Sequence, residues 1–342
     1  MRAAFFREAG QPLVIDQMDD PTPAAGDVVI AVQRAGICGS DLHITEYGAI
    51  PSGTVLGHEF AGEIVALGAN VGGDWKVGDR VTALPIHPCH DCDACDNHLP
   101  ALCRTNLFTG TTPLKQGAYA DYVSARGNML QRLPAGVSFD DGAMVEPLAV
   151  AYHAVEMAGA IKGNSVLVIG AGPIGAAVAV FARLAGARDV VVSERSEVRR
   201  QRALDVGASA VIDPVAENVG ERFRAIAGRA PQVVFECVGI PGLIQNALEL
   251  AGVRGRVVVA GVCFGEDKIQ PLTAFANEIS VAFSQCYVER DFERVIGHIA
   301  RNDINIRPMH TETIGFAQLP DTFEALRTAV GQCKVLIDPS RA

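Results

Sequence analysis

The sequence predicts an α/β protein with two domains: a β-rich domain formed by both ends of the chain, and a doubly wound parallel sheet between them. The chain has 342 residues, and domains of roughly 150 residues are usual, so two domains are expected. Strands and loops give way near residue 143 to alternating strands and helices, and this alternation ends near residue 285. The remaining tail has too little apolar material for a domain of its own, so we expect it to pack on the first domain. We therefore place the first domain at residues 1–145 and 286–342, and the second at 146–285.

The expected elements follow from the spacing of apolar residues. Short alternating segments typical of β-strands occur in the first domain at residues 27–38, 58–68 and 77–85. In the second domain, apolar strands are expected at 165–172, 189–194, 210–213, 232–239 and 255–262, with helices at 173–186, 196–208, 217–227 and 242–250. Strands that are apolar on both faces and alternate with helices predict a parallel sheet covered on both sides. The tail adds a helix at 290–301 and a strand at 334–338.

Composition excludes several kinds of partner. The net charge is -10 and the isoelectric point is about 5.3, so the surface repels nucleic acid and anionic membranes. The longest uncharged run, residues 163–182, contains a patterned glycine turn and a proline, so we do not expect it to span a membrane. The N-terminal segment carries Arg7 and Glu8 and lacks the apolar core of a signal peptide. We therefore expect a cytoplasmic protein.

A dinucleotide-binding turn is predicted at "VLVIGAGPIG". Gly170, Gly172 and Gly175 form G-x-G-x-x-G after a strand and before a helix, and Glu194 ends the next strand. The glycines permit a tight turn, and the helix N-terminus holds a pyrophosphate. Glu194 would accept hydrogen bonds from ribose hydroxyls and repel a 2′-phosphate, which favours NAD over NADP. A cluster of arginines follows, which either pairs with such a phosphate or forms a solvated helix face: Arg195, Arg199 and Arg200.

Residues 87–103 contain four cysteines with the spacing C-x2-C-x2-C-x7-C: Cys89, Cys92, Cys95 and Cys103. A disulfide knot, a redox pair and a metal site are the alternatives. A reducing compartment and an odd total of nine cysteines disfavour disulfides. A redox pair would begin a helix inside a βαβ unit, and this loop is not in one. Four thiolates complete a tetrahedral zinc site with no open position, so the loop predicts a structural zinc.

A second set of metal ligands is predicted from "GICGSDLHI" and "GHEFAG". Cys38, His58 and Glu59 offer a thiolate, an imidazole and a carboxylate, all of which bind zinc. No histidine stands four residues after His58, which excludes the H-E-x-x-H metalloprotease pattern. Another carboxylate, Glu146 in "VEPLAVAYHAV", lies at the expected domain boundary.

These motifs occur in an order that resembles the zinc-dependent medium-chain dehydrogenase/reductase (alcohol dehydrogenase) superfamily over essentially the whole chain. The resemblance implies a GroES-like catalytic domain with a structural zinc lobe at about 87–103, and a Rossmann NAD-binding domain. It implies a catalytic zinc held by Cys38, His58 and a carboxylate, for which Glu59 and Glu146 both qualify. Liver-type alcohol dehydrogenases have cysteine at the position of Glu146. This chain therefore looks more like the polyol and secondary-alcohol branch, which includes the sorbitol and butanediol dehydrogenases.

The family resemblance also implies the chemistry. Two zinc ions per chain, one catalytic and one structural, would support hydride transfer between a secondary alcohol, vicinal diol or polyol and NAD(+). Ser40 and His43 would relay the proton; the alternatives are a turn hydroxyl and a surface histidine. Asp41 would orient a ligand or cap the turn. The implied cofactor-binding residues are Gly170, Gly172, Pro173, Ile174, Gly175, Glu194, Arg195, Arg199, Val238, Gly261 and Val262.

Three points remain open alternatives. Family members usually form homodimers or homotetramers through their Rossmann sheets, so we expect one of these assemblies. The physiological reaction could instead be carbonyl reduction with NAD(P)H. A non-catalytic NAD(P)H-binding family member is the alternative from another functional class.

Overall fold

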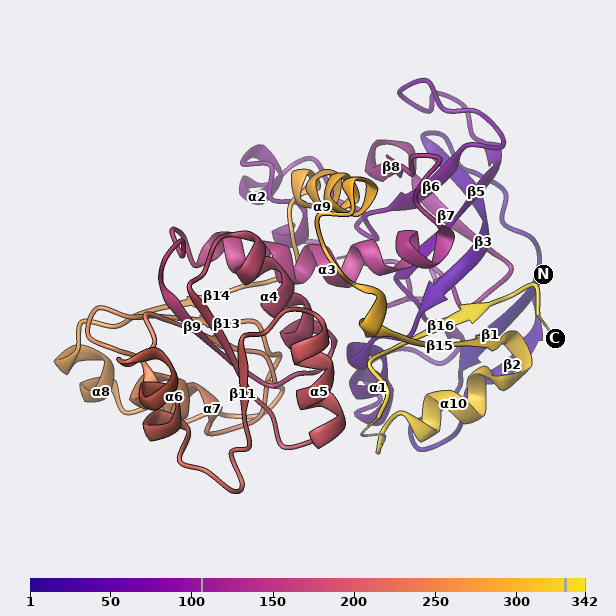
Figure 1. Ribbon diagram of the computed structural model, residues 1–342. Coiled ribbons are helices and arrows are strands. Elements are labelled where there is room, and N and C mark those ends of the chain that lie inside the picture. Colours follow the sequence, from indigo (N-terminus) through magenta and orange to yellow (C-terminus); the bar gives the residue numbers. More distant parts are fainter. Residues whose placement is uncertain (106, 329–330, 342) are drawn as a thin grey trace. The chain divides into compact units, whose positions relative to one another are not determined.

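The computed structural model describes residues 1–105, 107–328 and 331–341 of the chain. It divides into two compact units (Figure 1). The first consists of Met1–Glu146, Val288–Arg301 and Thr311–Ala342, and the second of Pro147–Tyr287 and Asn302–His310. A β-rich unit drawn from both ends of the chain and a parallel α/β unit confirm the predicted fold class.

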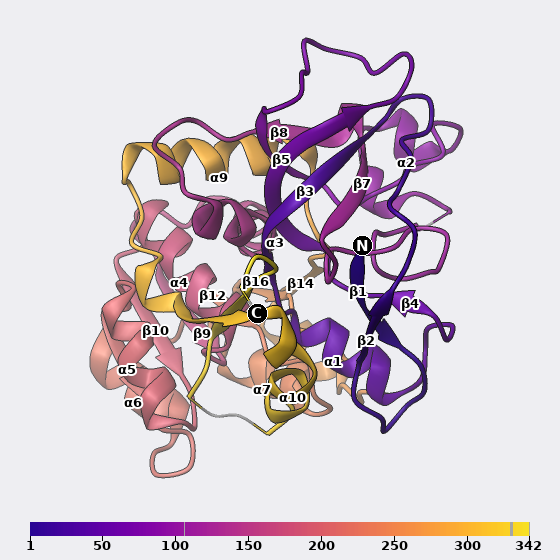
Figure 2. The same ribbon diagram turned by 90° about the vertical axis from the view of Figure 1, so that its right-hand side faces the viewer.

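The first unit contains two sheets. The smaller has the order β2-β1-β4, and the larger has the order β15-β16-β3-β5-β6-β8, with β7 also paired to β3 (Figure 2). The strands of the smaller sheet are β1 (Arg2–Phe6), β2 (Val14–Gln17) and β4 (Thr54–Val55). Those of the larger are β3 (Asp27–Gly36), β5 (Glu59–Leu67), β6 (Arg80–Ala83), β7 (Tyr122–Arg126), β8 (Leu130–Arg132), β15 (His310–Gly315) and β16 (Lys334–Asp338). The alternation of apolar and polar residues predicted β3 and β5, and these two strands form a long antiparallel pair.

The first unit also contains four α-helices among its described residues. They are α1 (Gly39–Glu46), α2 (Asp93–Asp96), α9 (Glu289–Arg301) and α10 (Leu319–Ala325). Helix α9 buries Phe292, Val295 and Ile296 on one face, as the 3.6-residue spacing requires. The long helix α3 (Phe139–Met157) belongs to both units, because the division falls between Glu146 and Pro147.

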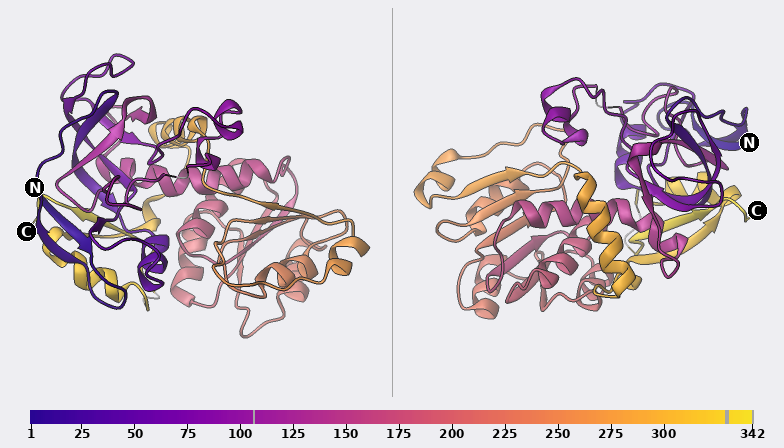
Figure 3. Two further views of the ribbon diagram at one scale, coloured as in Figure 1. Left: turned by 180° about the vertical axis from the view of Figure 1, so that it is seen from behind. Right: turned by 90° about the horizontal axis from the view of Figure 1, so that it is seen from above.

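The second unit, magenta to orange in Figure 3, contains a six-stranded parallel sheet in the order β11-β10-β9-β12-β13-β14. Its strands are β9 (Ser165–Ile169), β10 (Asp189–Ser193), β11 (Ala210–Ile212), β12 (Val233–Glu236), β13 (Arg256–Val259) and β14 (Ser280–Phe283). Its helices are α4 (Pro173–Leu184), α5 (Glu197–Asp205), α6 (Val219–Ala227), α7 (Leu243–Leu250) and α8 (Pro271–Ala276). This strand order is that of the Rossmann fold, which binds dinucleotides where the order reverses, here between β9 and β12.

The core of the second unit explains why these segments form strands. Phe223 of α6 and Ile244 and Leu248 of α7 pack in one buried cluster with strand side chains such as Leu167 and Val234. Side chains of the alternate strand positions, including Val166 and Val168, are also fully buried. Both faces of the strands are thus covered, which accounts for their unbroken apolar sequences. Among the described residues, no helix is long and apolar enough to cross a membrane.

Candidate active site and metal centres

Pairing between β3 and β5 brings the predicted catalytic ligands together. Cys38 is the N-cap residue of α1, two residues after β3 ends at Gly36. Glu59 begins β5 and lies opposite Gly36 in the register. As a result, ligand atoms of Cys38, His58 and Glu59 all lie within 4.8 Å of one another. We call these three residues the catalytic cluster.

Glu59 is held by a buried lysine that the sequence analysis did not single out. Nζ of Lys334 donates to both carboxylate oxygens of Glu59, at 2.6 and 2.7 Å, and to the carbonyl oxygen of Ile37 at 3.0 Å. The Lys334 side chain is 1% exposed and that of Glu59 is 0% exposed. A Cβ atom at Gly36 would lie 2.0 Å from Oε2 of Glu59, so glycine is needed opposite this carboxylate. Burial opposes the charge of Lys334, but attraction by Glu59 and Cys38 raises its pKa.

His58 is oriented by a buried carboxylate. Its Nδ1 lies 3.3 Å from Oδ1 of Asp41, which is 1% exposed. The phenol of Tyr119 donates to the other oxygen, Oδ2, at 2.7 Å. Asp41 therefore contacts His58, as it must if its role is to orient a metal ligand. Burial opposes the charged imidazole, but Asp41 and Cys38 raise the pKa of His58 well above its usual value.

The donor set of the cluster fits a zinc ion. A thiol, an imidazole and a carboxylate are typical ligands of catalytic zinc, which keeps a fourth position for water or substrate. The raised pKa of His58 means that the cluster, without a metal, attracts a proton to one of its ligand side chains. The same excess of negative charge would favour a divalent cation.

The other predicted catalytic residues lie in different surroundings. The hydroxyl of Ser40 donates to Sγ of Cys38 at 3.2 Å, so Ser40 contacts the cluster. The side chain of His43 is 56% exposed on α1, with Nδ1 3.8 Å from a Glu46 oxygen. Glu146 is buried and adds to the raised pKa of Lys334. Among the described residues, Glu59 lies within 4.8 Å of the other ligand atoms of the cluster, and Glu146 is not part of this group.

The four-cysteine loop forms a second cluster. The sulfurs of Cys89, Cys92, Cys95 and Cys103 lie within 4.8 Å of one another, and three of the Sγ–Sγ separations are 3.6, 3.9 and 4.0 Å. A disulfide would need about 2 Å, whereas four sulfurs about 2.3 Å from one zinc ion stand about 3.8 Å apart. None of the four cysteines of this loop forms a disulfide. The spacing of the sulfurs therefore fits a tetrahedral metal site.

Local structure suits a thiolate at Cys103, whereas burial and the neighbouring Cys92 raise the pKa of Cys95 to about 12. Cys92 is the N-cap residue of α2, and Cys103 follows a short 3-10 helix at Pro100–Leu102. The backbone N–H of Cys89 donates to Sγ of Cys103 at 3.2 Å. Burial opposes the charge, but donation from Thr105 and Cys89 lowers the pKa of Cys103 to about 5. A thiolate is the form that binds metal.

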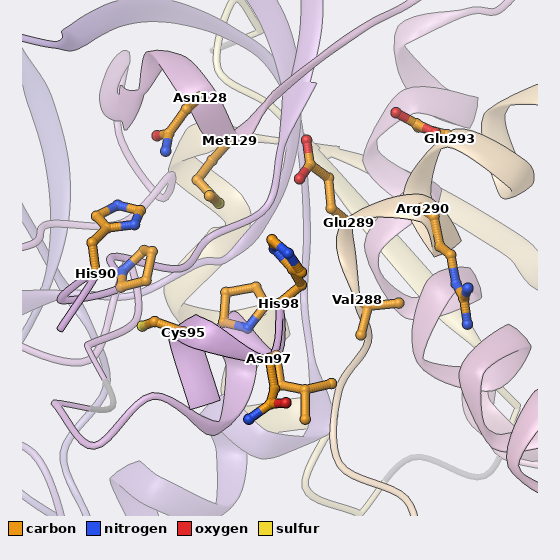
Figure 4. A pocket seen from close by; sticks show the side chains of 13 residues that line it. His90, Cys95, Asn97, His98, Asn128, Met129, Val288, Glu289, Arg290 and Glu293 are labelled. Atoms are coloured by element: carbon orange, nitrogen blue, oxygen red, sulfur yellow. The ribbon is translucent and has the colours of Figure 1, made fainter. Parts of the chain in front are cut away.

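A cavity of about 800 Å³ lies in the first unit, beside this loop (Figure 4). One side comes from the loop, including Cys95 and His98, and another from the start of α9, including Glu289 and Glu293. Burial and the neighbouring Glu293 raise the pKa of Glu289. None of the residues lining the cavity belongs to the catalytic cluster.

The glycine turn of the second unit connects β9 to α4. Gly170 has a φ of +93°, and Gly172 is the N-cap residue of α4, with Pro173 at the first helical position. A Cβ atom at Gly175 would lie 1.9 Å from the carbonyl oxygen of Gly170. Ile174 lies in the first turn of the helix. The turn thus leaves room for a ligand to approach the N-terminus of α4 closely.

Glu194 lies directly at this turn. Its Oε2 accepts a hydrogen bond from the N–H of Ala171 at 2.8 Å, and its Oε1 accepts one from Ser196 at 2.9 Å. Arg200 donates to the Glu194 and Arg195 carbonyl oxygens and pairs with Asp213 at 3.1 Å. Its guanidinium is therefore engaged within the protein. Arg195 is exposed and Arg199 is half-buried.

The remaining predicted cofactor residues follow β12 and β13. Val238 and Val262 are 43% and 65% exposed. A Cβ atom at Gly261 would lie 2.3 Å from the backbone nitrogen of Gly239, so these two loops approach closely. The carboxylate of Glu236, which sequence reasoning missed, accepts hydrogen bonds from Val238 and Gly239. It fixes the loop at the carboxyl end of the sheet, where Rossmann folds bind their ligands.

Comparisons with known proteins agree with this architecture. Residues 24–135 match the alcohol dehydrogenase GroES-like domain, and residues 173–301 match the zinc-binding dehydrogenase domain. The chain is 32% identical to 2-dehydro-3-deoxy-L-galactonate 5-dehydrogenase of Pseudoalteromonas atlantica over 88% of each chain. It is 30% identical to sorbitol dehydrogenase of Bos taurus, over 94% of this chain and 92% of that protein.

Solved structures give the same result. A zinc-binding dehydrogenase of Sinorhizobium meliloti bound to NADP has a TM-score of 0.90 and 32% identity, with 99% of each chain covered. The 2R,3R-butanediol dehydrogenase of Bacillus subtilis has a TM-score of 0.89 and 29% identity, also over 99% of each chain. The chain thus belongs to the zinc-dependent medium-chain dehydrogenase/reductase family, and within it resembles the sorbitol and butanediol dehydrogenases.

Proposed function

We propose that the protein is a zinc- and NAD-dependent dehydrogenase that oxidises a secondary alcohol, vicinal diol or polyol to the ketone or aldehyde. The catalytic cluster carries this proposal, because its three donors leave a position for a substrate oxygen. The sorbitol and butanediol dehydrogenases among its relatives support the substrate class. In this proposal residues 1–145 and 286–342 form the catalytic domain, and residues 146–285 bind the cofactor.

In the proposed reaction, Cys38, His58 and a carboxylate would hold the catalytic zinc. Glu59 is the preferred carboxylate, because it belongs to the cluster, and Glu146 is the alternative. Bound zinc would polarise the substrate hydroxyl and make it more acidic. Ser40, which already donates to Cys38, accepts the hydroxyl proton and passes it towards His43, whose exposed ring releases it to solvent. A bound nicotinamide cofactor would supply the acceptor for the hydride of the carbinol carbon.

The cofactor is held by the glycine turn and the loops after β12 and β13. Glu194 supports NAD as the preferred form, since its carboxylate lies at the turn and would repel a 2′-phosphate. The Sinorhizobium meliloti relative was solved with NADP, so NADP is the alternative to test. Substituting Glu194→Gln removes the charge but keeps the shape. If Glu194 selects NAD, this variant gains activity with NADP⁺ relative to NAD⁺.

The four cysteines of the loop hold the second, structural zinc in this proposal. They supply a complete set of four ligands and so leave no position for a substrate. The protein would then contain two zinc ions per chain and work in the cytoplasm, where these thiols remain reduced.

We also propose a homodimer or homotetramer. Strand β14 is at the edge of the parallel sheet, and its Val281 and Phe283 are 38% and 67% exposed. An exposed apolar edge strand of this kind pairs readily with another chain, and closed symmetry is usual for such assemblies. Substituting Val281→Lys should shift the oligomer towards smaller species in light scattering.

The function is tested by following NADH absorbance with a panel of vicinal diols, sugar alcohols and simple secondary alcohols, each with NAD⁺ and NADP⁺. Turnover of a diol or polyol that is lost on Cys38→Ser is the expected result. Metal analysis of the same samples should give two zinc ions for the wild type and one for Cys38→Ser. Absence of turnover across the panel with both cofactors would refute the proposal.

A further inference from the structure

We propose that Tyr119 is a positioning residue of the catalytic cluster: it fixes Asp41, and through Asp41 it fixes the ring of His58. The inference rests on the proposed function for its consequence in catalysis. Its geometric basis lies entirely within the first unit. Tyr119 lies in the segment before β7 and is 0% exposed.

Two buried side chains, Tyr119 and Asp41, lead to His58 of the cluster. The Tyr119 hydroxyl donates to Oδ2 of Asp41 at 2.7 Å and lies 3.4 Å from the carbonyl oxygen of Gly36. Oδ1 of Asp41 lies 3.3 Å from Nδ1 of His58. Because Nδ1 faces Asp41, Nε2 is the ring nitrogen left for a metal ion. A carboxylate that accepts a proton from a ligating histidine sets its tautomer and orientation.

Asp41 needs a second donor to do this. Its side chain is 1% exposed, and a buried carboxylate with an unsatisfied oxygen is costly. His58 contacts one oxygen and Tyr119 binds the other. With both oxygens held, the carboxylate is fixed against rotation about its terminal bond. Without the phenol, Oδ2 would be buried with no donor, and Asp41 could turn away from His58.

The ring of Tyr119 also packs against the backbone next to His58. Gly57 precedes His58 with a φ of +96°, and a Cβ atom there would lie 2.5 Å from Cδ1 of Tyr119. The backbone N–H of Tyr119 also donates to the carbonyl oxygen of Leu56 at 2.9 Å. Phe323 packs edge-on to the ring, with centroids 6.4 Å apart. Tyr119 thus has two separable parts: a ring that packs under the backbone and a hydroxyl that binds Asp41.

The hydroxyl keeps its proton under working conditions. Burial and the neighbouring Asp41 raise the pKa of Tyr119 well above its usual value. It therefore acts as a constant donor to Asp41 and takes no part in proton transfer.

The test compares Tyr119→Phe with Tyr122→Phe. The first substitution removes only the hydroxyl bound to Asp41. The second makes the same chemical change three residues away in the same unit, at a half-buried tyrosine. The zinc dissociation constant of the catalytic site is measured by competition with a chelator, using Cys38→Ser to identify the contribution of the four-cysteine site. The visible spectrum of the cobalt-substituted protein reports the ligand field directly.

We expect Tyr119→Phe to weaken zinc binding at the catalytic site by about tenfold, the lower end of the effect of losing an outer-shell partner. The cobalt bands should shift, and kcat/KM at saturating zinc should fall. Tyr122→Phe should match the wild type. In an Asp41→Asn background, Tyr119→Phe should have little further effect, because the pathway through Asp41 is already broken.

A zinc affinity of Tyr119→Phe equal to that of Tyr122→Phe would overturn the proposal. An equal loss in the Asp41→Asn background would also overturn it, since Tyr119 would then act through packing alone. Zinc binding is measured without substrate, so failure of the proposed dehydrogenase activity is a distinct outcome. A wild-type protein that binds zinc at Cys38 but oxidises no alcohol would contradict the proposed function and leave the role of Tyr119 measurable.

Discussion

Replacing Lys334 with methionine should destabilise the metal-free protein strongly. The ammonium of Lys334 is the partner of both Glu59 oxygens, and both side chains are almost completely buried. Methionine matches the unbranched lysine side chain as far as Cε, but it leaves the buried Glu59 carboxylate without a cation. Breaking a buried pair by removing one partner costs about 3–5 kcal/mol. The free energy of unfolding of a protein is only about 5–15 kcal/mol, so this loss is a large share of it.

Urea unfolding of the metal-free protein measures this loss conveniently. Trp75 is the only tryptophan of the chain and lies in the first unit, so its fluorescence reports the unit that contains the pair. Asp16→Asn is a matched control, because it weakens the exposed pair of Arg7 and Asp16, 3.6 Å apart, in the same unit. Exposed pairs contribute about 0–1 kcal/mol.

The double variant tests the coupling. In Lys334→Met/Glu59→Gln no charge is left unpaired, so it should be more stable than Lys334→Met alone, although one more residue has changed. A loss for Lys334→Met below about 1 kcal/mol, as expected for an exposed pair, would refute the reasoning. A double variant as unstable as the single one would show that the cost comes from packing and not from the unpaired carboxylate.

Three further results are expected. Gly36→Ala places a methyl group where Oε2 of Glu59 lies; overpacking of this kind costs about 1–3 kcal/mol, and metal analysis should show that only the four-cysteine site keeps its zinc. Cys95→Ser removes one of four ligands from the loop and should lower the zinc content from two to one and the melting temperature, while Cys38 still binds metal. Burial opposes the charge of Asp338, but Ser340 and Arg34 lower its pKa below that of a free aspartate. The ionised carboxylate therefore stabilises the fold at pH values above the pKa of a free aspartate, and this stabilisation is lost as the pH falls through the lowered pKa of the folded protein. Asp338→Asn should therefore flatten the acid side of a plot of urea midpoint against pH.

The parts of the protein that the sequence predicted well depend on short stretches of chain. The glycine turn, its following helix and Glu194 lie within a single βαβ unit, where spacing alone carries the geometry. The four cysteines lie within fifteen positions, so their spacing sufficed to predict a cluster with a metal-site geometry. The Rossmann strand order follows from alternating strands and helices.

The parts that the sequence did not reveal depend on long-range pairing. Lys334 and Glu59 are 275 positions apart, and they meet because β16 and β5 both pair with β3 at Gly36. Tyr119 and Asp41 are 78 positions apart. Register between distant strands is set by the whole sheet, so no local pattern contains it.

A signal for Lys334 was nevertheless present. It begins the strand "KVLID", in which every residue is buried, and a lysine at such a position is not stable unless an acidic group accepts its charge. The sequence therefore implied a buried carboxylate near the start of this strand, although it could not say which one. Glu59 is that carboxylate, and the same ammonium also fixes the orientation in which Glu59 meets Cys38 and His58. A charged residue at the head of a buried strand is thus a reason to look for a ligand cluster on the neighbouring strands.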